Sequence, residues 1–104
     1  MPMKTSIQEH RGEIAEFCRR YRVRRLELFG SAVGDRFDPW TSDFDFLVEF
    51  EGLPPAEHSR CYFGLLFALT DLLGRDVDLV ETGAIRNPYF LRAIANDRVL
   101  LYAA

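Results

Sequence analysis

Two aspartates at alternating positions carry the clearest chemical signal in this sequence. Asp43 and Asp45 lie in and beside the apolar run of residues 44–48. Alternate side chains of a strand share a face, so we expect both carboxylates on one face with Cα atoms roughly 6–7 Å apart. Such a pair is often only solvent-facing, but an acidic pair with no basic residue in the same run is costly unless a cation binds it. Two adjacent carboxylates therefore predict a Mg²⁺ site.

A possible phosphate-binding turn precedes this pair. Residues 26–29 alternate like a strand and lead into Gly30 and Ser31. Backbone N–H groups at such a turn favour anions, although an ordinary turn has the same sequence. Arg36 is a further candidate for triphosphate binding, with a local ion pair to Asp35 or Asp38 as the alternative. A strand, a phosphate turn and a metal pair together suggest a site for a nucleoside triphosphate.

A third carboxylate lies in a later apolar run. Asp78 is flanked by Val77 and Leu79, whereas Asp76 lies beside Arg75, where a turn or an ion pair accounts for it. If the strand of Asp78 neighbours that of Asp45, its carboxylate can face the same metal site. It can then accept a proton from an attacking hydroxyl.

The elements that position these residues follow from periodicity and from turn residues. Helical spacing predicts helices over residues 6–21, 56–73 and 88–96, the first with a Ser6–Glu9 capping box. Strand alternation predicts strands over 25–29, 43–50 and 76–80, and a short strand over 99–102. This alternation predicts a single α/β (α+β) domain over residues 1–104, with a mixed sheet of three to four strands and helices packed on it.

Composition limits the remaining possibilities. The chain has 104 residues, 48% of them hydrophobic, and a net charge of −3, which does not favour direct nucleic-acid binding. The arginines of residues 19–25 are interpreted as a solvated helix end, with an acidic partner as the alternative. Cys18 and Cys61 are expected to be buried and unpaired, which is consistent with the cytoplasm, and no run is long enough to span a membrane.

Two other residues have weaker chemical signals. His58 has no companion His or Cys at metal-ligand spacing, so it is predicted to be an exposed helix residue. Trp40 could lie on a nucleobase or pack against the edge of the domain.

In combination, these motifs resemble the minimal nucleotidyltransferases of the DNA polymerase β superfamily. The resemblance rests on residues 28–31, 42–48 and 77–80 in this order, and the segments 85–90 and 99–102 are similar to the family's C-terminal part. It covers nearly the whole chain.

The resemblance implies transfer of a nucleoside monophosphate, usually AMP from ATP, to an acceptor hydroxyl. It implies that Gly30 and Ser31 hold the triphosphate, that Asp43 and Asp45 bind two Mg²⁺ ions, and that Asp78 completes one metal site. The family is also similar to antitoxins that silence HEPN-domain ribonuclease toxins by attaching AMP to a toxin tyrosine. A nearby-encoded HEPN toxin is therefore the expected partner.

One segment departs from the family pattern. Many relatives carry an Ala-Arg-Gly-like element after the Gly-Ser, whereas here Ser31 precedes Ala32-Val33-Gly34-Asp35-Arg36. Two alternatives to the enzyme of a toxin partner stay open. The chain could be a non-catalytic module that masks a partner protein, or a transferase of small molecules such as aminoglycosides, for which a homodimer would have to supply the acceptor pocket.

Overall fold

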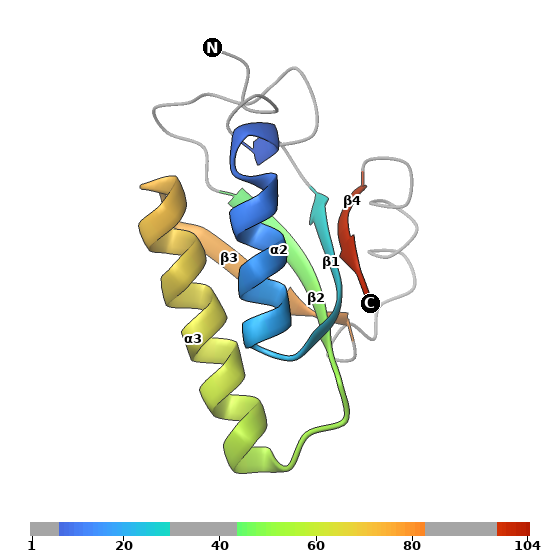
Figure 1. The fold of residues 1–104 in the computed structure, drawn as a ribbon. Helices are drawn as coiled ribbons and strands as arrows, with labels where there is room; N and C mark the ends of the chain where they lie inside the picture. The colour runs from blue at the N-terminus through green and yellow to red at the C-terminus, as the bar shows by residue number, and fades with distance from the viewer. Residues whose placement is uncertain (1–6, 30–43, 83–97) are drawn as a thin grey trace, which may run out of the picture.

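A four-stranded mixed sheet with two helices on one face forms the body of the protein (Figure 1). The computed structural model describes residues 7–29, 44–82 and 98–104. The strands are β1 (Val23–Phe29), β2 (Phe44–Phe50), β3 (Val77–Glu81) and β4 (Val99–Ala103), and the helices are α2 (Arg11–Arg20) and α3 (Pro55–Leu73). This architecture confirms the predicted α+β class.

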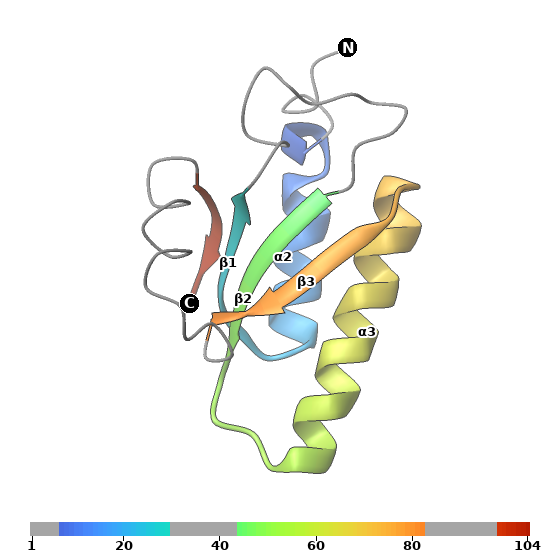
Figure 2. The same cartoon turned by 180° about the vertical axis from the view of Figure 1, so that it is seen from behind.

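The sheet has the strand order β3-β2-β1-β4. β1 pairs antiparallel with both β2 and β4, whereas β2 and β3 run parallel. The parallel pair is possible because α3 returns the chain from the end of β2 to the start of β3 (Figure 2). The crossover therefore brings two strands that are far apart in sequence into direct register.

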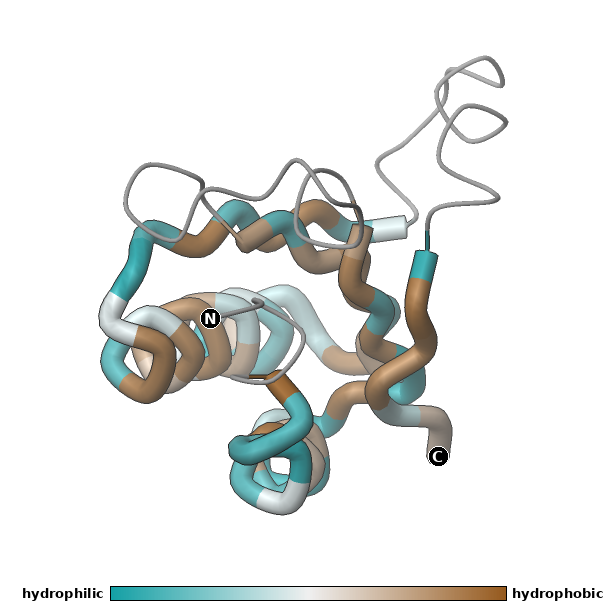
Figure 3. Tube along the Cα trace, turned by 90° about the horizontal axis from the view of Figure 1, so that it is seen from above, coloured by the Kyte–Doolittle hydropathy of each residue, from teal (hydrophilic) through white to brown (hydrophobic). Residues whose placement is uncertain are grey.

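Both helices pack on the same face of the sheet, as Figure 3 shows from above. Inward side chains at strand and helix spacing meet in one core, in which Ile14, Leu26, Phe46, Leu65 and Leu69 are fully buried. The hydroxyl of Tyr62 donates a hydrogen bond to the backbone oxygen of Leu79 at 2.6 Å and ties α3 to β3. The apolar face predicted for residues 56–73 is thus the face that α3 buries.

Several boundaries and contacts differ from the sequence expectations. The first helical region is interrupted by a turn at His10, so α2 begins at Arg11. β1 begins at Val23, because Arg22 adopts a left-handed conformation (φ 61°) that turns the chain after α2. The predicted capping residue Ser6 and the predicted helix over 88–96 lie outside the described residues.

The arginines of residues 19–25 are solvent-exposed, as predicted, and four of the five pair with nearby acids. Arg19 donates to Glu16 at 2.6 Å within α2, while Arg22 lies 3.2 Å from Glu51. Arg24 of β1 lies 3.9 Å from Glu49 of the neighbouring β2. Arg25 lies 3.2 Å from Glu27 on its own strand. These ion pairs neutralise most of the cluster locally.

Cys18 and Cys61 are buried and free, as predicted. Burial raises the pKa of the Cys18 thiol from 9.0 to about 12, because the thiolate would lose its hydration inside the core. In the part of the chain that the structure describes, no helix is long and apolar enough to cross a membrane.

Candidate active site

Asp45 and Asp78 are direct neighbours on adjacent strands. In the parallel pair of β2 and β3, Asp45 is in register with Asp78. Residues in register on neighbouring strands share a face and lie about 4.8 Å apart. Their neighbours Phe46 and Leu79 point into the core, so by alternation the two carboxylates belong to the opposite face of the sheet. Both helices cover the core face (Figure 2). The adjacency of the two strands, which the sequence argument set only as a condition, is therefore met.

The end of β1 meets the same point of the sheet. Phe29, the last residue of β1, is in register with Asp45. β1 therefore finishes at the end of the sheet where the two carboxylates lie. Four predicted site residues fall outside the described residues, together with Trp40: Gly30, Ser31, Arg36 and Asp43.

Three apolar residues pack together beside the two carboxylates, on the same face of the sheet. Phe29 and Leu47 form a second buried cluster, against which Val80 packs. These three residues lie on the face of Asp45 and Asp78, because they alternate with core residues along their strands. An apolar surround lowers the local dielectric constant, which strengthens the attraction between carboxylates and a bound cation.

Glu27 is a buried acid on this face that the sequence analysis did not single out. It is 7% exposed and lies between two guanidinium groups, 3.2 Å from Arg25 and 3.6 Å from Arg98. The two arginines satisfy the charge, so Glu27 joins β1 to the start of β4 rather than leaving a free carboxylate. An acid between Leu26 and Leu28 was the available signal, but its partners could not be read from the sequence.

The donor set fits a hard divalent cation. Asp45 is half-buried and Asp78 is exposed. Carboxylate oxygens of both residues are therefore accessible to an ion on the same face of the sheet. Mg²⁺ takes oxygen ligands at about 2.0–2.1 Å and keeps several waters, so a site of a few carboxylates is sufficient. Among the described residues no group of three or more His, Cys, Asp or Glu could hold a metal. The described part of the site is thus a pair, to which Asp43 would add a third carboxylate.

The negative field near Asp78 extends to its neighbours. Burial raises the pKa of the Tyr62 hydroxyl, and the charges of Glu81 and Asp78 raise it further. Ionisation of Tyr62 is therefore disfavoured next to these carboxylates.

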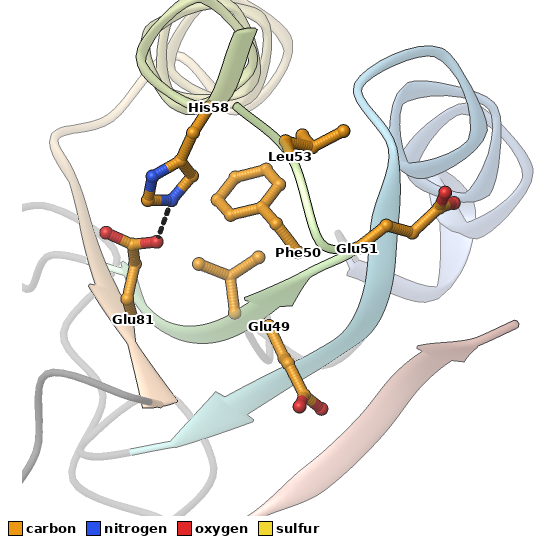
Figure 4. A pocket seen from close by; sticks show the side chains of 7 residues that line it. Glu49, Phe50, Glu51, Leu53, His58 and Glu81 are labelled. Carbon is orange, nitrogen blue, oxygen red and sulfur yellow. Dashed lines mark hydrogen bonds and ion pairs between the residues drawn. The ribbon is translucent and has the colours of Figure 1, made fainter. Parts of the chain in front are cut away.

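A separate cavity lies at the other end of β2. It has a volume of about 470 Å³ and is lined by residues 48–51, Leu53, His58 and Glu81 (Figure 4). His58 forms an ion pair with Glu81 and packs edge-on against Phe50 at 5.4 Å, so it is a bridging residue between α3 and β3 rather than the exposed residue predicted. Because the cavity surrounds the C-terminal end of β2 and Asp45 lies near its start, it is not the candidate active site.

Comparisons with known proteins identify the family of the chain. The family model of the nucleotidyltransferase domain matches residues 12–101. The chain is 36% identical over 97 residues to a protein of Methanocaldococcus jannaschii described as a "Putative protein adenylyltransferase", covering 93% of this chain and 92% of the relative. A second protein of that organism with the same description is 29% identical over 99 residues, covering 95% and 94%.

Solved structures share the fold. A structure described as a "putative minimal nucleotidyltransferase" aligns with a TM-score of 0.71 and 29% identity, covering 95% of both chains. A complex of a tri-AMPylated HEPN toxin of Shewanella oneidensis with its MNT antitoxin aligns with a TM-score of 0.62 and 21% identity, covering 93% of this chain and 72% of the other. A toxin–antitoxin complex with AMP-PNP gives 0.65 and 21%, covering 90% and 73%.

The family match spans most of the chain, and it includes both strands that carry the described carboxylates. The predicted family, fold and enzyme class are thereby confirmed. The chain belongs to the nucleotidyltransferase domain family, among its minimal members, and is a nucleotidyltransferase.

Proposed function

We propose that this protein transfers AMP from ATP, with Mg²⁺, to a hydroxyl of a partner protein, and that the acceptor is a tyrosine of a HEPN-type toxin. The observation that carries the proposal is the register of Asp45 with Asp78, at the end of the sheet where β1 finishes at Phe29. A nucleotide bound at this end would have its phosphates next to two carboxylates.

The residues of the chain would have separate tasks in this reaction. Backbone N–H groups of Gly30 and Ser31 would bind the triphosphate, and Arg36 would add positive charge beside it. Asp43, Asp45 and Asp78 would hold two Mg²⁺ ions, which supply neutralisation of the phosphate charge and lower the pKa of the attacking hydroxyl. This assignment gives each predicted site residue a role that substitution can test.

The chemical step is a displacement at the α-phosphorus of ATP. The acceptor oxygen forms a bond to this phosphorus, the bond from phosphorus to the β-phosphate oxygen breaks, and pyrophosphate leaves. Asp78 is exposed, so its carboxylate is accessible to an incoming hydroxyl and would take the proton that the hydroxyl loses. Asp45 is half-buried beside the apolar residues Phe29 and Leu47 and would hold its position during transfer.

A protein acceptor is supported by the relatives. Both relatives of Methanocaldococcus jannaschii carry names that specify a protein as the acceptor.

The test is the intact mass of the protein encoded next to this one after co-expression. We expect mass increments of whole AMP units with the native chain and none with Asp45→Asn or Asp78→Asn. Tandem mass spectrometry should locate the increments on tyrosine. Asp76→Asn is the matched control, because Asp76 is an exposed acid two residues before Asp78.

Other outcomes would redirect the assignment. A stable complex with no mass increment in any variant would favour the binding module that masks its partner. No increment and no complex would point to a small-molecule acceptor, which can be searched with labelled ATP. Increments that persist in both Asp→Asn variants would remove the carboxylate pair from the mechanism.

A further inference from the structure

Two phenylalanines lie on the outward face of α3. Phe63 is 50% exposed and Phe67 is 67% exposed, whereas the other large hydrophobic residues of the described chain, apart from Leu100, are buried or partly buried. They are four residues apart, so they share one side of the helix, and their ring centroids are 6.4 Å apart. Leu65 and Leu69, on the opposite side, are fully buried. α3 is therefore apolar on both its inner and its outer side.

Charged residues of opposite sign border this apolar surface. Arg60 lies one turn before Phe63, and Asp71 lies one turn after Phe67, both exposed. These four residues, Arg60, Phe63, Phe67 and Asp71, are called the α3 strip below. Along the helix the strip reads positive, aromatic, aromatic, negative.

We propose that the α3 strip is a dimer interface, in which α3 packs antiparallel against α3 of a second copy across a two-fold axis. The argument is charge complementarity. In an antiparallel pair, Arg60 of one copy meets Asp71 of the other at both ends, and the phenylalanines meet in the middle. A parallel pair would instead place like charges side by side, which is unfavourable.

The spacing of the strip fits a two-fold axis. At a rise of about 1.5 Å per residue, the midpoint between Arg60 and Asp71 lies within about 1 Å of the midpoint between Phe63 and Phe67. One axis therefore aligns the charged pair and the aromatic pair together, as a self-complementary interface requires. Arg60 already contacts Glu57 on its own helix, but a guanidinium has five N–H donors and can bind a second carboxylate.

The size of the interface predicts a weak dimer. α3 has 19 residues and is therefore about 28 Å long, so a single pair of helices buries roughly 800 Å² in total. This area is below that of standard stable interfaces, so we expect a dissociation constant in the micromolar range or above.

The dimer would leave the carboxylate face open. The strip residues are exposed and lie opposite the buried side of α3. α3 covers one face of the sheet (Figures 1 and 2), and Asp45 and Asp78 belong to the other face. Dimerisation and nucleotide transfer use different surfaces, so this inference does not depend on the proposed function.

Sedimentation equilibrium of the purified chain over a wide concentration range tests the interface. We expect a concentration-dependent dimer that weakens at least about tenfold in Arg60→Glu or Asp71→Arg, because both symmetry-related contacts become repulsive. An equimolar mixture of these two variants should form heterodimers, because every end contact then joins opposite charges. The double variant Arg60→Glu/Asp71→Arg should restore the homodimer.

Two further variants complete the design. Phe63→Ser/Phe67→Ser should abolish the dimer while circular dichroism shows an intact fold, since both rings are largely exposed. Arg20→Glu on α2 is the matched control for the change in net charge and should leave the dimer unchanged. A monomer at every concentration, or a dimer insensitive to the strip variants, would overturn the proposal. If Phe63→Ser/Phe67→Ser still dimerises but no longer binds the co-expressed partner, the strip is the binding surface for that partner and not a dimer interface.

Discussion

Asp45 and Asp78 are 33 positions apart in sequence and face each other across the parallel pair of β2 and β3. This relationship explains why neither acid forms a site alone. Asp45 is the half-buried residue among the buried residues 44–48 of β2, and Asp78 is the exposed residue of β3. Two carboxylates held side by side repel each other, and we propose that a divalent cation relieves this repulsion.

Replacing either member of the pair is expected to remove transfer without unfolding the protein. Asp45→Asn and Asp78→Asn keep the side-chain volume but lose the charge that binds the cation. A loss of several kcal/mol of transition-state stabilisation predicts a rate reduction of at least about a hundredfold. The measurement is the initial rate of AMP incorporation at saturating ATP. Asp76→Asn should retain the native rate, and an equal loss in that control would instead indicate a general effect of charge on binding.

Addition of Mg²⁺ is expected to raise the melting temperature of the native chain. A ligand that binds only the folded state stabilises it by mass action, by about 2.7 kcal/mol at a hundredfold excess over its dissociation constant. Thermal unfolding at increasing Mg²⁺, and again after EDTA, measures the effect. In Asp45→Asn the response should shrink, because one ligand is lost. Equal shifts in the two proteins would mean that the cation binds elsewhere.

The sequence predicted the elements better than their partners. Apolar alternation around Asp45 and Asp78 identified two strands, and the expected apolar face of residues 56–73 is the buried face of α3. Alternation cannot give the order of strands in a sheet, since it depends on the path of the chain through α3. The adjacency of the two acids was therefore only a condition in the sequence argument, and the structure supplies it.

The sequence predictions for His58 and Glu27 were incomplete for the same physical reason: the partners of both residues are distant along the chain. His58 was read as exposed because its neighbours in sequence offer no ligand, yet its partner Glu81 lies 23 residues away. Glu27 lies between two leucines, but this local signal does not identify its partner Arg98, which comes from the other end of the chain. Long-range ion pairs need tertiary contacts, which periodicity does not contain.

Two helical glycines are expected to respond oppositely to alanine. A Cβ on Gly64 of α3 would overlap the ring of Tyr21, and a Cβ on Gly12 of α2 would have no atom within 4 Å. Overpacking costs about 1–3 kcal/mol, more than the about 1 kcal/mol that alanine gains over glycine in a helix. Urea unfolding should show that Gly64→Ala lowers the free energy of unfolding and Gly12→Ala raises it. A gain in Gly64→Ala would mean that Tyr21 moves aside at little cost.

The buried Cys18 is expected to make the protein less stable at alkaline pH. Burial raises the pKa of its thiol from 9.0 to about 12 in the folded chain, whereas the unfolded chain ionises near the ordinary value. Between these two pH values the unfolded chain binds fewer protons, so stability falls as pH rises, by up to about 1.4 kcal/mol per unit. Below pH 9.0 both states keep the proton and the effect is absent.

Comparison with Cys18→Ala isolates this contribution. The variant loses packing and is less stable at every pH, but it has no thiol to titrate. The difference in the free energy of unfolding between the two proteins should therefore be constant from neutral pH to about pH 9 and shrink above it. The raised pKa of Tyr62 affects both proteins equally and cancels in the difference. Curves that stay parallel into the alkaline range would show that the thiol ionises in the folded core as readily as in the unfolded chain.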